Sequence, residues 1–97
     1  MASLTYSSRA FADLERLTDF LIESDPVAAA ETVDLISEAV AILKRHPLVG
    51  RPVDGEIREL IISRGKTGYV ALYSHEDEYD VVLILAIRHQ REAGYAG

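Results

Sequence analysis

Four side chains near the end of the sequence have the chemistry to bind or process an anion. They are Arg88, His89, Arg91 and Tyr95. An arginine binds a carboxylate or phosphate through two parallel hydrogen bonds, and a histidine transfers protons near neutral pH. A tyrosine can stack or donate a hydrogen bond. The alternative is a solvated C-terminal end with no specific role.

The segment before this group predicts how it is positioned. Residues 81–87 form an uninterrupted apolar run that is rich in β-branched side chains and too short to cross a membrane. A strand with one wet face would alternate, so the run predicts a strand covered on both faces at the centre of a sheet. We therefore expect the cations that follow to lie at a fixed place on the sheet's rim.

Other kinds of chemistry find little support in the sequence. His46, His75 and His89 are far apart and have no metal-ligand spacing, so we expect solvated histidines at element ends, no metal and no cofactor. Residues 65–68 (GKTG) lack the glycine-rich frame of a phosphate loop and predict a hairpin turn with a basic tip. No serine or threonine lies in a recognisable nucleophile turn.

Arg58 has two interpretations. In an alternating strand, Ile57, Glu59 and Ile61 share one face, and Arg58, Leu60 and Ile62 share the other. Either Arg58 or Glu59 must therefore point towards covered space. Arg58 is then either a structural arginine held by an internal acid or a functional one.

Composition limits the class of protein. A chain of 97 residues predicts one domain, residues 1–97, with one modest core. The absence of cysteine excludes disulfides, and with no expected signal peptide or membrane segment we expect a cytoplasmic protein. The net charge of −6 argues against broad nucleic-acid binding, although residues 44–72 hold more bases than acids.

The pattern of elements predicts an α+β fold in the order β-α-α-β-β-β. A short strand at residues 4–6 precedes two helices, the first capped by Ser7 or Ser8 and the second by Asp25 before Pro26. The expected core-facing side chains are Phe11, Leu14, Leu17, Leu21 and Ile22 in the first helix, and Ala29, Val33, Ile36, Val40 and Leu43 in the second. The opposite face of the first helix carries Asp13, Glu15, Arg16, Asp19 and Glu23, which we expect to face solvent. After a loop at residues 46–55, strands at 57–63, 69–75 and 79–88 predict an antiparallel meander. The helical hairpin should cover one face of this mainly antiparallel sheet.

These motifs, in this order, resemble the RelE/ParE superfamily of bacterial toxins, often called plasmid-stabilisation proteins. The similarity extends over nearly the whole chain. It follows the helical hairpin through residues 47–52 (PLVGRP), 57–60 (IREL), 65–73 (GKTGYVALY) and 87–95 (IRHQREAGY). The resemblance implies a small α+β toxin that forms a hetero-oligomer with the antitoxin that neutralises it.

Two activities occur on this fold, and the fold alone does not choose between them. RelE-like members cut mRNA in the ribosome with lysines, arginines and a tail tyrosine, whereas ParE-like members poison DNA gyrase and are not nucleases. Here residues 57–63 contain no lysine, Val70 follows Gly68-Tyr69, and His89 lies at the arginine position of the tail, although Tyr95 matches. Most cations that would stabilise a phosphorane-like transition state are missing, so the resemblance favours a ParE-like toxin that acts by binding.

Each possible function assigns roles to particular residues. In the RelE-like alternative, His89 and Tyr95 are the catalytic candidates, and a third possibility is a non-toxic domain that only binds an antitoxin. For the ParE-like toxin, the candidate partner-binding residues are cationic or lie beside cations, and would attract an acidic antitoxin segment: Arg51, Arg58, Arg64, Lys66, Arg88, His89, Arg91 and Tyr95.

Overall fold

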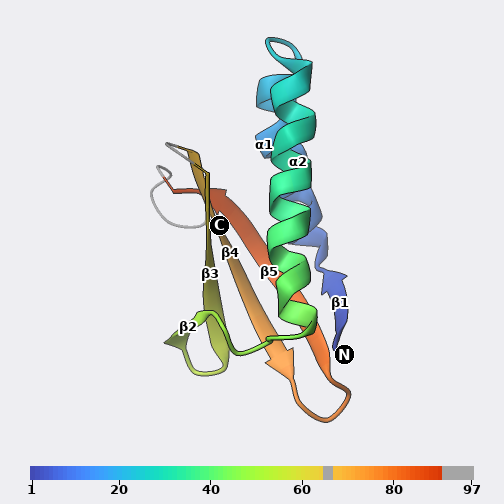
Figure 1. Cartoon of the computed structure of the whole chain (residues 1–97), viewed down its shortest axis with the longest axis vertical. Helices are drawn as coiled ribbons and strands as arrows, with labels where there is room; N and C mark the ends of the chain where they lie inside the picture. Colours follow the sequence, from blue (N-terminus) through green and yellow to red (C-terminus); the bar gives the residue numbers. More distant parts are fainter. Residues whose placement is uncertain (65–66, 91–97) are drawn as a thin grey trace.

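A helical hairpin packs on one face of a five-stranded sheet in the computed structural model, which describes residues 1–64 and 67–90 (Figure 1). Side chains are described for these residues except 63, 64 and 67. The elements follow the order β1 (Ser3–Tyr6), α1 (Ser8–Ile22), α2 (Pro26–Ala41), a 3₁₀ turn η1 (Ile42–Lys44), β2 (Arg51–Asp54), β3 (Ile57–Arg64), β4 (Thr67–Glu76) and β5 (Val81–His89). The helices extend past one end of the sheet.

The sheet confirms the predicted meander and its mainly antiparallel character. Its strand order is β1-β5-β4-β3-β2, with β3, β4 and β5 paired antiparallel and β1 parallel to β5. The predicted caps are also confirmed, because the side chains of Ser7 and Asp25 accept hydrogen bonds from the first turns of α1 and α2. No helix among the described residues is long and apolar enough to cross a membrane.

The predicted loop at residues 46–55 was wrong in part, because it contains β2. Pro52 argued against a strand, since proline cannot donate to a ladder. However, β2 is an edge strand that pairs on one side only, with β3 over Ile57 to Glu59, and an edge tolerates proline. Gly55 makes the turn between β2 and β3 with a φ of 57°, a conformation that favours glycine.

The prediction that residues 81–87 are covered on both faces was also wrong. Burial alternates along β5, with Val82 and Ile84 buried and Val81 and Leu83 half-buried. The helices cover only one face of the sheet, and the opposite face, which we call the open face, has no second layer in the described structure. β5 does lie inside the sheet, between β1 and β4, although β4 is the central strand.

The core-facing side of α1 differs from the prediction as well. Phe11 and Ile22 are exposed, whereas Asp13, expected on the solvent side, is buried with 7% of its surface accessible. Phe11 stacks on Tyr6 at a ring-centroid distance of 5.4 Å. The predicted stripe of the second helix is confirmed at Ala29, Ile36 and Val40 in α2 and at Leu43 in η1, but Val33 is exposed.

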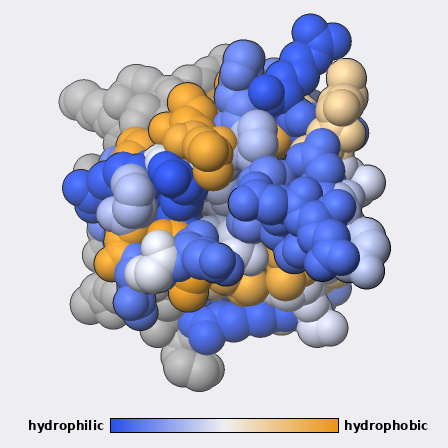
Figure 2. Space-filling view, turned by 90° about the horizontal axis from the view of Figure 1, so that it is seen from below, coloured by the Kyte–Doolittle hydropathy of each residue, from blue (hydrophilic) through white to orange (hydrophobic). Residues whose placement is uncertain are grey.

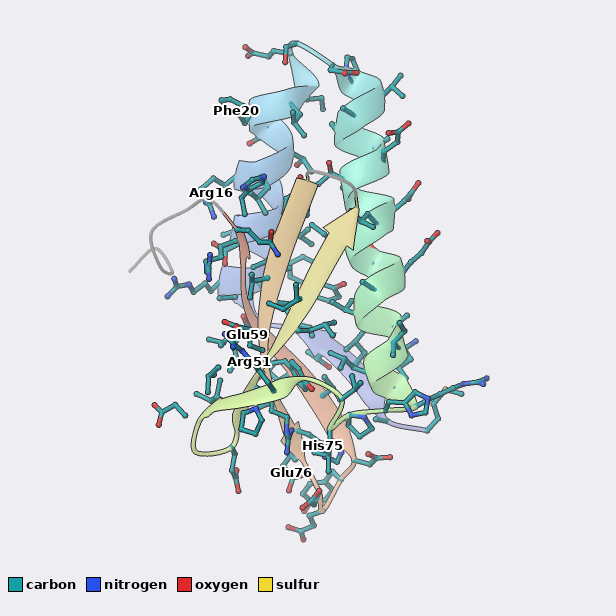
Figure 3. The ribbon with its side chains drawn as sticks, turned by 60° about the vertical axis from the view of Figure 1, so that its left-hand side comes forward. Arg16, Phe20, Arg51, Glu59, His75 and Glu76 are labelled. Atoms are coloured by element: carbon teal, nitrogen blue, oxygen red, sulfur yellow. The ribbon has the colours of Figure 1, made fainter. Side chains whose placement is uncertain are left out.

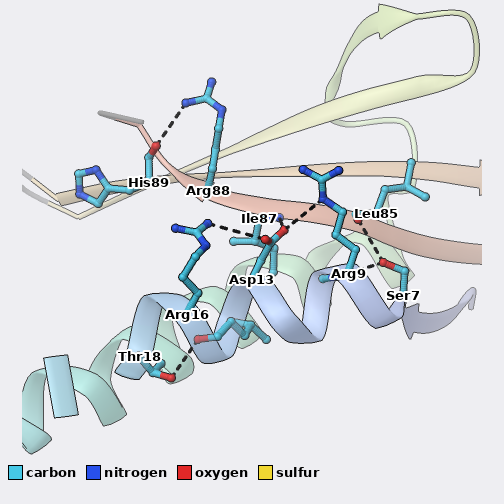
Figure 4. Close-up of polar contacts among 11 residues, drawn as sticks. Ser7, Arg9, Asp13, Arg16, Thr18, Leu85, Ile87, Arg88 and His89 are labelled. Carbon is cyan, nitrogen blue, oxygen red and sulfur yellow. Dashed lines mark hydrogen bonds and ion pairs between the residues drawn. The ribbon is translucent and has the colours of Figure 1, made fainter. Parts of the chain in front are cut away.

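Asp13 is buried because α1 takes the place of a strand beside β5. β1 pairs with β5 only as far as Tyr6 and Ile84. Beyond that point, the Ser7 hydroxyl donates to the Leu85 carbonyl at 3.1 Å, and the Asp13 carboxylate accepts from the Ile87 N–H at 2.9 Å (Figure 4). A bulge at Leu85 interrupts the β4–β5 register here. Two side chains of the α1 segment therefore satisfy backbone groups that an edge would leave open.

The loop between η1 and β2 is fixed by a second internal contact. The Gly50 N–H donates to the hydroxyl of the fully buried Tyr73 at 2.8 Å. A side chain at Gly50 would collide with the Tyr73 ring and the Glu59 carbonyl, at 2.6–2.8 Å, so only glycine fits. Figure 2 views this end of the molecule from below, where exposed hydrophobic side chains lie among hydrophilic ones. Leu48, Val49 and Val53 are exposed in this loop and β2, and residues 46–49 line a shallow hollow.

Replacing Asp13 with alanine should destabilise the fold by about 1–3 kcal/mol, because the buried Ile87 N–H loses its acceptor. Chemical denaturation measures this change. Asp19→Ala, on the exposed side of α1, is the matched control and should change stability by less than about 0.5 kcal/mol. Equal effects of the two substitutions would contradict the role assigned to Asp13.

Tyr73 should make the fold sensitive to alkaline pH. Burial raises the pKa of Tyr73 above 10.0, and the Gly50 N–H and the charge of Arg58 oppose this rise. Since the folded state holds the phenolic proton more tightly, this stabilisation is complete below the unfolded pKa and is lost as pH rises through the folded pKa. The free energy of unfolding should therefore fall above about pH 10, and less steeply in Tyr73→Phe.

The exposed Tyr79 supplies the control for this titration, since 74% of its surface is accessible. Tyr79→Phe should keep the alkaline loss of stability seen in the parent protein. Burial also raises the pKa of Tyr6, so Tyr6→Phe should reduce the loss separately. If Tyr73→Phe left the pH dependence unchanged, the assignment to Tyr73 would be wrong.

Candidate partner-binding site

Arg58 is part of the framework that holds the loop before β2. It is half-buried, and its Nη1 donates to the carbonyls of Leu48 at 3.1 Å and Gly50 at 2.7 Å. The register places Arg58 opposite Tyr73, on the helix-covered face of the sheet, a choice that the alternation had left open between Arg58 and Glu59. These hydrogen bonds go to backbone carbonyls, and Glu59 lies on the other face of the sheet.

Arg51 is held by that acid. Its Nε and Nη2 donate to one carboxylate oxygen of Glu59 at 3.1 and 2.8 Å. The side chain of Glu59 is 8% exposed, whereas that of Arg51 is 72% exposed (Figure 3). A nearly buried carboxylate requires a paired cation, so Arg51 is engaged by Glu59 within the protein.

Arg88 and His89 lie at the end of β5 and point to opposite faces of the sheet. Arg88 is opposite Val70 on the open face, and His89 is opposite Tyr69 on the helix-covered face. The His89 and Tyr69 rings meet edge to face at 5.3 Å. The Nη1 of Arg88 donates to the carbonyls of His89 at 3.3 Å and Gln90 at 3.4 Å. The two neighbours in sequence therefore serve different surfaces.

The remaining candidates are described only in part. The backbone of Arg64 pairs with Thr67, so the β3–β4 connection lies at the same end of the sheet as Arg88 and His89. Nothing is described of the Arg64 side chain, and Lys66, Arg91 and Tyr95 lie outside the described residues. Their roles as partner-binding or catalytic residues stay predictions.

Arg9 and Arg16 are two exposed cations that the sequence patterns did not indicate as partner-binding candidates. Both lie on the side of α1 that carries Asp13, with nitrogen-to-oxygen distances of 3.9 and 3.7 Å to its carboxylate (Figure 4). Their side chains remain 42% and 43% exposed beside the last residues of β5. The spacing of residues 9, 13 and 16 places them on one face of the helix. Because Asp13 is charged, this face was predicted to be exposed to solvent.

His75 also differs from the solvated residue that was predicted. Its side chain is 10% exposed, and its Nε2 lies 2.8 Å from the Asp80 carboxylate and its Nδ1 3.2 Å from that of Asp77. These contacts order the β4–β5 turn. Among the residues that the structure describes, no three potential ligands converge on a position for a metal ion.

The resulting surface is suited to contact with another macromolecule. Over the described residues, the open face carries Ile61, Leu72, Arg88 and the Arg51–Glu59 pair. His89, which follows Arg88 in the sequence, points to the opposite face. Such a surface supplies apolar area and bidentate donors, which are the usual components of a protein interface.

The sequence and the fold both match known toxins. The family model of the ParE toxin of type II toxin–antitoxin systems, parDE, matches residues 4–94. The protein named Toxin RelE3 from Caulobacter vibrioides is 37% identical over 92 residues, which cover 95% of this chain and 98% of that protein.

Two solved complexes have the same fold. One is the chromosomal ParDE system from P. aeruginosa, with a TM-score of 0.74, 27% identity and coverage of 92% of this chain and 96% of that one. The other is the RelBE2 toxin–antitoxin complex from Mycobacterium tuberculosis, with a TM-score of 0.62, 28% identity and coverage of 94% and 93%. These matches confirm the resemblance read from the motifs: the chain belongs to the ParE toxin family of type II toxin–antitoxin systems, within the RelE/ParE superfamily.

Proposed function

We propose that this toxin inhibits DNA gyrase by binding to it, and that a cognate antitoxin neutralises it. The observation that carries the proposal is the separation of the cationic groups at the end of β5. Arg88 lies on the open face, whereas His89 packs against Tyr69 on the opposite one. Cleavage of RNA needs a proton-transferring group and charge-stabilising cations around one phosphate, and these two groups do not share a face.

Two further arginines support the same function. Arg51 pairs with the Glu59 carboxylate and Arg58 donates to two loop carbonyls, so donors of both side chains are used within the protein. The chain as a whole carries −6, which opposes approach to the dense phosphate of a ribosome. A toxin that recognises a protein surface does not meet this electrostatic barrier.

The free edge of β3 is suited to the antitoxin. β2 pairs with β3 only up to Glu59, so in the described chain no strand covers the outer edge of β3 from residue 60 onward. Ile61 lies on this stretch and is 49% exposed. An extended antitoxin segment that added as a strand would satisfy the open backbone groups and cover Ile61. Arg88 lies at this end of the sheet and would attract an acidic segment. Lys66 and Arg91, which lie outside the described residues, are expected to add to this attraction through their charge.

A second candidate function is ribosome-dependent mRNA cleavage. It is favoured by the relatives in Caulobacter vibrioides and Mycobacterium tuberculosis, which are named RelE3 and RelBE2. In that function His89 and Tyr95 would be catalytic, and the contact of His89 with Tyr69 would orient its ring. A third candidate, a domain that binds an antitoxin but is not toxic, predicts no effect in either assay below.

Purified toxin should inhibit gyrase supercoiling and accumulate broken DNA in a cleavage-complex assay, while a translating extract continues to make protein from intact mRNA. Arg88→Ala should weaken the inhibition because it removes a donor from the open face. Arg45→Ala is the matched control, since Arg45 is an exposed arginine next to η1, far from the end of β5.

The opposite pattern would reject the proposal. If mRNA were cut in the extract, gyrase were unaffected, and His89→Ala or Tyr95→Ala abolished the cutting, the protein would be a RelE-like nuclease. If neither assay responded but antitoxin binding were retained, the domain would be non-toxic.

A further inference from the structure

An apolar strip runs along one side of the helical hairpin and uses both helices. On α1 it consists of Phe11 and Ile22, which lie at positions i and i+11 of one helix and so share a face. On α2 it consists of Ala30 and Val33, which are three residues apart. All four residues are exposed, and Phe11 at 56% and Ile22 at 54% expose much apolar surface for their size. We call these four residues the hairpin strip.

Tyr6 shows that the two halves of the hairpin strip belong to one surface. Its ring stacks on Phe11 at 5.4 Å. Burial raises the pKa of Tyr6 and a side-chain hydrogen bond with Ser37 opposes this rise, so Tyr6 contacts α2 as well as α1. Ser37 is one turn after Val33 and shares its side of α2. Because the two helices run antiparallel, this side of α2 also passes close to Ile22, where α1 ends (Figure 1).

Acidic side chains border the hairpin strip on both helices. Glu15 and Asp19 lie on α1, and Asp34 and Glu38 lie on α2. All four are exposed, and within the described part of the chain none of them forms an ion pair. The strip is therefore an exposed apolar surface in a region of negative charge.

We propose that the hairpin strip binds an amphipathic helix of a partner protein, in which lysines or arginines flank the apolar stripe. Phe11 and Ile22 are eleven residues apart, about 16 Å along the helix axis. A partner helix of about three turns has the same length. Its apolar stripe covers Phe11, Ile22 and Val33, and its cations pair with the acids of α1 on one flank and of α2 on the other.

Charge distinguishes such a helix from other occupants. A nucleic acid or an anionic lipid surface would be repelled by the bordering acids. A second copy of this chain would place like charges opposite one another. The acidic antitoxin segment proposed for the edge of β3 would be repelled as well, so the two surfaces select partners of opposite charge. The inference does not depend on the toxin's cellular target, since it rests on the hairpin alone.

The test uses the full chain and a labelled helical peptide with leucines at positions i, i+4, i+7 and i+11 and lysines on both flanks of that stripe. Fluorescence anisotropy should show at least about fivefold tighter binding than for a peptide of the same composition in scrambled order. Binding should weaken as salt is added. Ile22→Ser should weaken it about fivefold, and Glu15→Gln combined with Asp34→Asn about threefold.

Two control variants separate the strip from the rest of the surface. Phe20→Ser is matched to Ile22→Ser, because Phe20 is also an apolar residue of α1 and is 83% exposed, but two helical positions turn it to nearly the opposite side. Glu56→Gln removes one exposed acid in the turn between β2 and β3. Both should leave binding unchanged. Ile22 is substituted rather than Phe11, because Phe11 stacks on Tyr6 and contributes to packing.

Several results would overturn the inference. Equal binding of the ordered and scrambled peptides, or equal effects of Ile22→Ser and Phe20→Ser, would exclude a specific apolar strip. Equal or tighter binding of a peptide with glutamate in place of each lysine would exclude the selection by charge. Self-association of the toxin that disappears in Ile22→Ser, measured by sedimentation, would assign the strip to a second copy of the chain.

Discussion

The hydrogen bond from the Ile87 N–H to the Asp13 carboxylate is the interaction on which the rest of this structure depends. Together with the Ser7–Leu85 contact, it joins the start of α1 to the edge of β5 at the bulge where β1 stops. Without it, the buried Ile87 N–H of β5 would lose this hydrogen-bond acceptor. The same bond fixes the position of α1 and the direction in which β5 presents Arg88 and His89.

Burial of two carboxylates, those of Asp13 and Glu59, also explains where several arginines lie. Burial of Asp13 brings Arg9 and Arg16 to its side, and burial of Glu59 does the same for Arg51. Arg51 makes two short hydrogen bonds with its acid, whereas Arg9 and Arg16 share one carboxylate at longer distances. Buried carboxylates in α1 and β3 therefore hold arginines of α1 and β2 close to them.

Much of the fold followed from local signals, and most of the errors came from contacts between distant segments. Ser7, Asp25 and Pro26 predicted the helix starts because capping needs only neighbouring residues. Burial of Asp13 could not be predicted, since its partner is 74 positions away. Similarly, β2 depends on pairing with β3, and the role of Arg58 depends on the loop carbonyls that Tyr73 holds in place. Helical periodicity placed Asp13 on the solvent side because it weighs polarity without knowing which backbone groups need an acceptor.

The central claim is that this toxin recognises a protein target through the open face of the sheet at the end of β5. Hydrogen–deuterium exchange of the toxin alone, with gyrase and with ribosomes tests it most directly. The account predicts that gyrase slows amide exchange at the end of β5, and that ribosomes leave this segment unchanged. Slower exchange there with ribosomes, and no change with gyrase, would contradict it.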